Sequence, residues 1–285
     1  MAWGTAVRLL TSGGTVIGLA TLTDLPGVVN GATALMAGVI AEAIYATIAI
    51  RPLLQNELSE TIVNDEEPLT YRELFWFHLP LAGTAVMVLL VQPLVTFSLA
   101  RLDRPTQSLA AWPVVFQIML MARAAALALP EAVIALTKGP DSYAPIRRFS
   151  LILAAIVGVV VTLFTFSPLA RLYLFGVQDM TAEVGTLAQD SLIYFLPFPA
   201  LTVIGMWLRG VLINGRKTTA INVAMVVNMV VTVTVLAIGL VGQWPGLPTA
   251  AVALTLAVLA EIIYLAWRAQ QYLPAFTPGM ATREI

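Results

Sequence analysis

The chain has 285 residues, of which 59% are hydrophobic and only 11% are charged, and its formal net charge is -1. About a quarter of the residues of a soluble domain are charged, so a water-soluble core could not bury this much apolar surface. The near-neutral charge excludes the basic surface typical of nucleic-acid binding. The absence of cysteine excludes disulfides and thiolate chemistry.

Apolar stretches of about 20 residues, the length that crosses a bilayer as a helix, recur along the chain. They predict an all-α integral membrane protein with about eight transmembrane helices. The predicted spans are 4–22, 28–50, 76–99, 109–137, 149–168, 190–213, 218–241 and 247–267.

The longest polar segment, 51–75, is acidic and is interpreted as a cytoplasmic linker. It separates residues 1–50, with two spans, from residues 76–268, with six, and 269–285 form a C-terminal tail. Ten of the 15 Lys and Arg residues fall in segments on the side of the N-terminus, and three fall on the other side. Because basic loops stay in the cytoplasm, we expect both termini there and the chain in the cell (inner) membrane.

The second and last spans are similar when superposed without a gap at an offset of 219 residues (261 − 42 = 219). Ten of about 21 positions then match, and Pro, Gly, Glu and Tyr among them are not default residues of a membrane helix. The matches are Pro26-Gly27 with Pro245-Gly246, Ala32 with Ala251, Ala34-Leu35 with Ala253-Leu254, Val39 with Val258, Ala41-Glu42 with Ala260-Glu261, and Ile44-Tyr45 with Ile263-Tyr264.

We interpret this likeness as an internal duplication, with convergence of two terminal hairpins as the alternative. The first two spans are then the last two helices of a first six-helix repeat, and the other six are a complete second repeat, parallel to the first. The counterpart of Leu74 would lie at 74 − 219 = −145. We therefore expect a full-length relative to carry four more helices, and this chain to be truncated at its N-terminus.

Short motifs follow one another between about residues 70 and 270. They are Leu74–Ala82 (LFWFHLPLA), Leu129–Ala132 (LPEA), Phe175–Asp179 (FGVQD), Phe195–Pro199 (FLPFP), and Gly210–Leu212 (GVL) followed by Gly215–Thr218 (GRKT). In this order, with two helix groups and an acidic linker, they resemble the MATE-like superfamily of multidrug, oligosaccharide-lipid and polysaccharide exporters. The second half looks most like the progressive ankylosis (ANK) transporter family. The resemblance implies alternating-access transport of a small anion, such as pyrophosphate, a nucleotide or citrate.

Arg123 is the leading candidate for a substrate-binding residue, because a charge near the middle of a span costs a few kcal/mol unless it faces a cavity or a partner. A guanidinium binds phosphate or carboxylate through two donors. Gln117 and Glu131 lie in the same predicted span. The alternatives for Arg123 are a structural salt bridge and a side chain that snorkels to the interface.

Prolines interrupt two predicted spans, at Pro93, directly after Gln92, and at Pro197 and Pro199. Proline removes a helix hydrogen bond, and broken helices line the binding sites of many transporters. We predict Gln92 as a further binding residue and the three prolines as hinges. Simple packing kinks are the alternative.

Other polar residues receive structural interpretations. The only histidine, His78, is expected at the interface rather than in proton coupling or a metal site, since Cys and a second His are missing. We interpret Glu42 and Glu261 as residues that hydrogen-bond to neighbouring helices, with a role as cavity acids as the alternative. Asn222 and Asn228 are interpreted as interhelical contacts rather than ligands. Arg209, Arg216 and Lys217 are expected to be cytoplasmic anchors.

The sequence thus predicts a secondary transporter of a small anionic solute, without enzymatic activity, cofactor, metal or nucleic-acid partner. A lipid-linked oligosaccharide flippase or drug exporter of the same superfamily is the nearest alternative. A non-transporting membrane assembly protein or an inactive fragment is an alternative of another class. A homodimer is expected if the chain is not a fragment.

Overall fold

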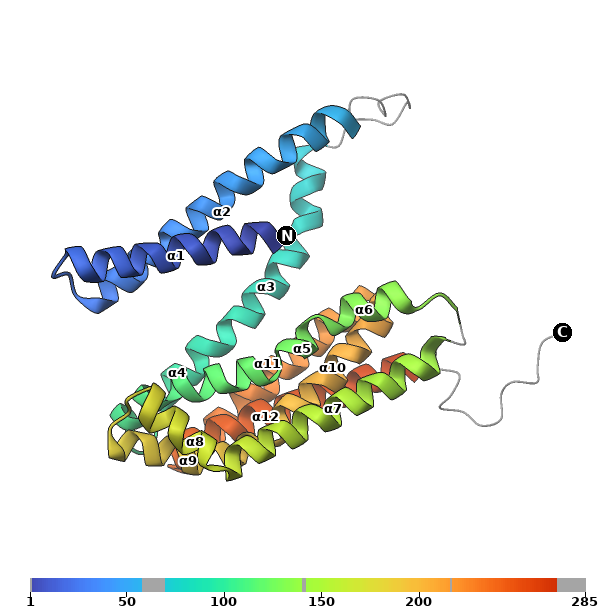
Figure 1. Cartoon of the computed structure of the whole chain (residues 1–285). Helices are drawn as coiled ribbons and strands as arrows, with labels where there is room; N and C mark the ends of the chain where they lie inside the picture. Colours follow the sequence, from blue (N-terminus) through green and yellow to red (C-terminus); the bar gives the residue numbers. More distant parts are fainter. Residues whose placement is uncertain (1, 58–69, 140–141, 216, 271–285) are drawn as a thin grey trace. The chain divides into compact units, whose positions relative to one another are not determined.

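The computed structural model describes residues 2–57, 70–139, 142–215 and 217–270, and these residues are almost entirely helical (Figure 1). The chain divides into two compact units, Met1–Tyr71 and Arg72–Ile285. This division falls inside the predicted linker 51–75. Within the described residues the linker is partly helical, because one helix runs on to Glu57 and the next begins at Tyr71.

Unit 1 is a helical hairpin of α1 (Ala2–Leu22) and α2 (Gly27–Glu57). Small residues let the two helices approach closely: a Cβ on Gly38 would lie 2.9 Å from the backbone oxygen of Arg8. Glu42 on α2 accepts a hydrogen bond from Arg8 on α1 at 3.3 Å. Glu42 therefore has a neighbouring helix as its partner, as its structural interpretation predicts.

Unit 2 is a helical bundle built around α10 (Pro197–Asn214). This helix packs against α6 (Leu129–Leu136), α7 (Tyr143–Phe166) and α12 (Gly246–Ala269). The other elements are α3 (Tyr71–Leu99), α4 (Pro105–Ala122), α5 (Ala124–Leu127), α8 (Pro168–Arg171), the π-helical segment η2 (Leu172–Val177), α9 (Ala182–Phe195) and α11 (Thr218–Val241).

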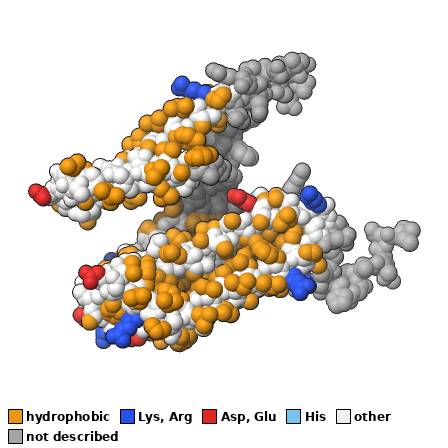
Figure 2. Space-filling model, viewed as in Figure 1, with side chains coloured by type: hydrophobic (Ala, Val, Ile, Leu, Met, Phe, Trp, Pro, Cys, Tyr) orange, Lys and Arg blue, Asp and Glu red, His pale blue; other side chains and the backbone are white. Residues whose placement is uncertain are grey.

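Six helices in the described part of the chain are long and apolar enough to cross a bilayer: α1, α2, α7, α10, α11 and α12. Their outward faces are apolar as well; α7, for example, buries Val157 and Val161 but exposes Ile156 and Leu163. A helix that is apolar on all sides is typical of a membrane span. On the face of unit 2 shown in Figure 2, hydrophobic side chains predominate and charged groups lie mostly toward the ends of the bundle.

Two predicted spans differ from single helices. The segment predicted as 109–137 consists of α4, α5 and α6, with interruptions at Arg123 and Ala128. Pro130 explains the second interruption, because it has no N–H to offer to the carbonyl of Ala126.

The segment predicted as 190–213 is likewise interrupted, at Leu196, between α9 and α10. Pro197, at the first position of α10, is the cause. The first of these helices, α9, begins at Ala182, eight residues before the predicted start, in a stretch that includes the charged residue Glu183.

The close contact between α6 and α10 yields a test. A Cβ on Gly210 would lie 2.8 Å from Cβ of Val133 and 3.0 Å from Cα of Pro130. We therefore expect Gly210→Ala to push the helices apart and to lower the free energy of unfolding by about 1–3 kcal/mol. Thermal unfolding of the purified protein in detergent measures the loss. Gly158→Ala is the matched control, since its added Cβ would be 3.6 Å from Cβ of Ala200, an ordinary contact. Equal melting temperatures for the two variants would contradict the prediction.

Candidate functional site

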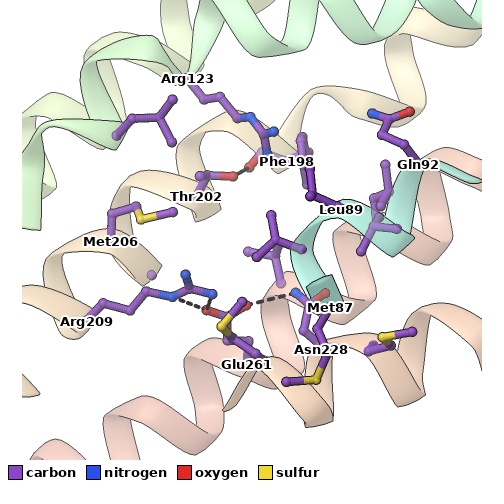
Figure 3. A pocket seen from close by; sticks show the side chains of 18 of the residues that line it. Met87, Leu89, Gln92, Arg123, Phe198, Thr202, Met206, Arg209, Asn228 and Glu261 are labelled. Carbon is purple, nitrogen blue, oxygen red and sulfur yellow. Dashed lines mark hydrogen bonds and ion pairs between the residues drawn. The ribbon is translucent and has the colours of Figure 1, made fainter. Parts of the chain in front are cut away.

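Unit 2 contains a cavity of about 390 Å³ between α3, the α4–α5 junction, α10, α11 and α12 (Figure 3). This volume lies within the range of small-molecule sites in proteins. Most of the lining is apolar, and it includes Met87, Met206, Met225 and Met229. Six polar or charged residues also line it: Gln92, Arg123, Thr202, Arg209, Asn228 and Glu261.

Arg123 enters the cavity from the interruption between α4 and α5, where it ends the first helix with φ −95° and ψ 5°. Its guanidinium carbon lies 5.3 Å from the ring centre of Phe198 and 5.6 Å from that of Phe116. Both distances are within the range of cation–π attraction. Its Nε is buried and has no hydrogen-bond partner among the described residues. The cation is therefore held by two rings, and no carboxylate in the described structure neutralises it.

The interruption at Arg123 lies beside the one that precedes α10, because Phe198 is the second residue of that helix. Backbone that departs from a regular helix is tolerated at membrane depth where protein or a cavity surrounds it. The two interruptions thus meet at the wall of the cavity, on which Arg123 and Phe198 both lie.

One face of α10 forms a continuous wall of the cavity. Phe198, Thr202, Met206 and Arg209 follow one another at intervals of four, four and three residues, the spacing of a single helix face. The Thr202 hydroxyl donates to the backbone oxygen of Phe198 at 2.8 Å. The rise of 1.5 Å per residue places about 16 Å of helix axis between Phe198 and Arg209.

At the far end of this face, Glu261 joins three helices (Figure 3). Its Oε1 accepts from Nε of Arg209 on α10 at 2.7 Å, and its Oε2 accepts from Nδ2 of Asn228 on α11 at 2.8 Å. The side chain of Glu261 is 6% exposed and that of Arg209 is 19% exposed. Because Nη2 of Arg209 also contacts Oε1, the positive charge of Arg209 is neutralised locally.

Gln92 lies on the α3 wall of the cavity, and Nε1 of Trp112 on α4 donates to its Oε1 at 3.1 Å. Trp112 in turn packs against Phe116 and Phe195. This contact fixes the carbonyl end of the Gln92 amide on α4, so its NH₂ end is the part that can serve a ligand.

The structure brings Arg123 and Gln92 to one cavity but places Gln117 and Glu131 elsewhere. Both of those side chains are exposed and do not line the cavity. The interruption at Ala128 also separates Arg123 from Glu131, which were predicted to lie in one continuous span.

The predicted hinges differ in their surroundings. Pro93 lies within α3, which continues through it without interruption, whereas Pro197 and Pro199 occupy the first turn of α10. The side chain of His78 and the whole of Arg216 lie outside the described residues.

The site also contains residues to which sequence reasoning gave other roles. Arg209 was expected to be a cytoplasmic anchor, and Glu261 and Asn228 were expected to make structural contacts. The contacts between helices are present, yet all three side chains also line the cavity. An acid within one span and a base within another could have indicated such a pair, because isolated charges at membrane depth are costly.

Comparisons with protein-family models, with curated proteins and with solved structures return no match for this chain. An apolar cavity with an unpaired guanidinium, a free amide NH₂ and a neutral ion pair can bind an anion.

The buried pair yields a second test. Glu261→Ala leaves Arg209 in the cavity wall without its counter-charge, so we expect a loss of about 3–5 kcal/mol in the free energy of unfolding. Thermal unfolding in detergent, with the exposed Glu131→Ala as control, measures this loss. The double variant Arg209→Met with Glu261→Met should recover most of the stability, because neither charge is then left unpaired. A double variant as unstable as the single one would show that the ion pair is not what stabilises this region.

Proposed function

We propose that this protein is a secondary transporter of anionic solutes that works by alternating access. The observation that supports this most directly is Arg123, whose cation lies in the cavity against two aromatic rings and without an acidic partner among the described residues. An ionisable group at membrane depth that has no protein partner is a functional residue by default. A solute with a carboxylate, phosphate or sulfonate group would supply the missing counter-charge.

The proposal includes the arrangement of two plus six spans in a MATE-like fold. Helix ends support the duplication: α1 ends at Leu22 and α11 at Val241, while α2 begins at Gly27 and α12 at Gly246, all at the offset of 219 residues. In both hairpins a glutamate of the second helix accepts a hydrogen bond from the first helix, 34 residues back in one and 33 in the other. We place the protein in the inner membrane with both termini in the cytoplasm.

The cavity favours a small solute over a lipid-linked oligosaccharide. A flippase for a pyrophosphate-linked lipid needs several free cations in its cavity, whereas Arg209 is already taken by Glu261. Among the described lining residues Arg123 is the one cation without an acidic partner.

Transport by proteoliposomes tests the proposal. The purified protein is reconstituted, and efflux of pyrophosphate, citrate and biphenyl-4-sulfonate is measured separately. We expect at least one of the three anions to be transported, and Arg123→Ala to slow that transport by about tenfold or more, since a charged hydrogen bond is lost. Arg123→Lys should retain part of the rate because the positive charge remains.

Arg171→Ala is the matched control, because Arg171 is exposed and is not part of the cavity lining. Its transport rate should equal that of the wild type. Unchanged transport by Arg123→Ala would remove Arg123 from the mechanism. If none of the three anions is transported, the proposal fails and a non-transporting membrane role takes its place.

A further inference from the structure

The cavity carries one net positive charge among its described lining residues, and this charge lies at one end. Arg209 and Glu261 cancel at the other end, and Asn228 takes the remaining carboxylate oxygen. Arg123 lies beside Phe198, and about 16 Å of the axis of α10 separates Phe198 from Arg209. The charges of the cavity therefore favour a ligand with one negative group, which would lie next to Arg123.

The surface that leads away from Arg123 is apolar. On α10 it continues as Thr202, whose hydroxyl proton is already donated to the backbone, and Met206. Met225 and Met229 of α11 and Met87 of α3 complete the wall. Methionine is flexible and polarisable, so this surface can adapt to apolar bodies of different shapes.

A second negative group on the ligand would find no free counter-charge among the described residues of this surface. It would lie either against methionine and aromatic side chains, where an unpaired charge is costly, or beside Glu261, which repels it. The same argument disfavours compact polyanions, which would bring several charges to one guanidinium.

From this arrangement we propose that the cavity selects an amphipathic organic monoanion, whose charged end binds Arg123 and whose elongated apolar body lies along α10 over Met206. The inference rests on the proposed transport function for its biological meaning and narrows the substrate class of the same site. It departs from pyrophosphate and citrate, the anions implied by the family resemblance.

Binding measurements test the charge selectivity separately from transport. The wild-type protein is placed in phosphatidylcholine nanodiscs and titrated calorimetrically with biphenyl-4-sulfonate, biphenyl-4,4'-disulfonate and pyrophosphate. We expect the monosulfonate to bind at least about tenfold more tightly than either of the other two, because each added charge meets an apolar wall. Equal or tighter binding of the disulfonate or of pyrophosphate would overturn the inference.

The variant Glu261→Gln should bind the disulfonate more tightly than the wild type does, which a cavity that binds ligands only through apolar contacts would not show. The amide still accepts from Arg209 but no longer cancels its charge, so the far end of α10 acquires a second cation. Relative to the monosulfonate, binding of the disulfonate should improve about tenfold. Glu131→Gln, on an exposed glutamate outside the cavity, should leave the ratio unchanged. An unchanged ratio in a folded Glu261→Gln protein would contradict the inference, and the wild-type ranking decides the matter if that variant does not fold.

The source of such an anion, water or the bilayer, is distinguished in a further arm with nanodiscs that contain phosphatidylglycerol. If the lipid weakens binding of the monosulfonate in the wild type and not in Arg123→Ala, a lipid headgroup is the natural occupant. If binding is unaffected, the occupant is a free amphipathic anion, and both results support the monoanion site.

Binding of the monosulfonate without transport of any anion would defeat the transport proposal alone. Transport of pyrophosphate or citrate without monosulfonate binding would defeat this inference alone.

Discussion

The carboxylate of Glu261 connects three of the helices that wall the cavity of unit 2. It lies on α12, and its two oxygens accept hydrogen bonds from Arg209 on α10 and Asn228 on α11. A buried carboxylate is tolerated only when its lone pairs are satisfied, so the positions of these helices and the charge of Glu261 depend on one another. The same contacts neutralise Arg209. The net positive charge among the described lining residues therefore comes from Arg123.

Arg123 owes its position to irregular backbone. It ends α4 at an interruption, and the ring of Phe198 next to it belongs to the first turn of α10, directly after another interruption. The segments α4–α5–α6 and α9–α10 contain three helix breaks, at Arg123, Ala128 and Leu196. Prolines account for the breaks at Ala128 and Leu196. Regular helices would have continued past these points, and the wall that holds the guanidinium between two rings would have a different shape.

The two terminal hairpins show how similar sequences lead to different environments. Glu42 and Glu261 match in the repeat, and each accepts a hydrogen bond from the helix before it. In unit 1 the side chains of Arg8 and Glu42 are 48% and 32% exposed, whereas Glu261 is buried in unit 2 by α10. The local contact follows from the hairpin, and the burial follows from the helices packed around it.

The sequence by itself determined the helical membrane class, the approximate position of most spans and the helix break at Pro197. These features depend on the length and polarity of local segments. It also singled out Arg123, because a charge within a long apolar run is conspicuous. Only the tertiary structure decided that Arg209, Asn228 and Glu261 meet at the cavity and that Gln117 and Glu131 remain outside it. In membrane helices that are apolar all round, hydrophobic periodicity hardly distinguishes the inward from the outward face, since lipid is as apolar as a protein core.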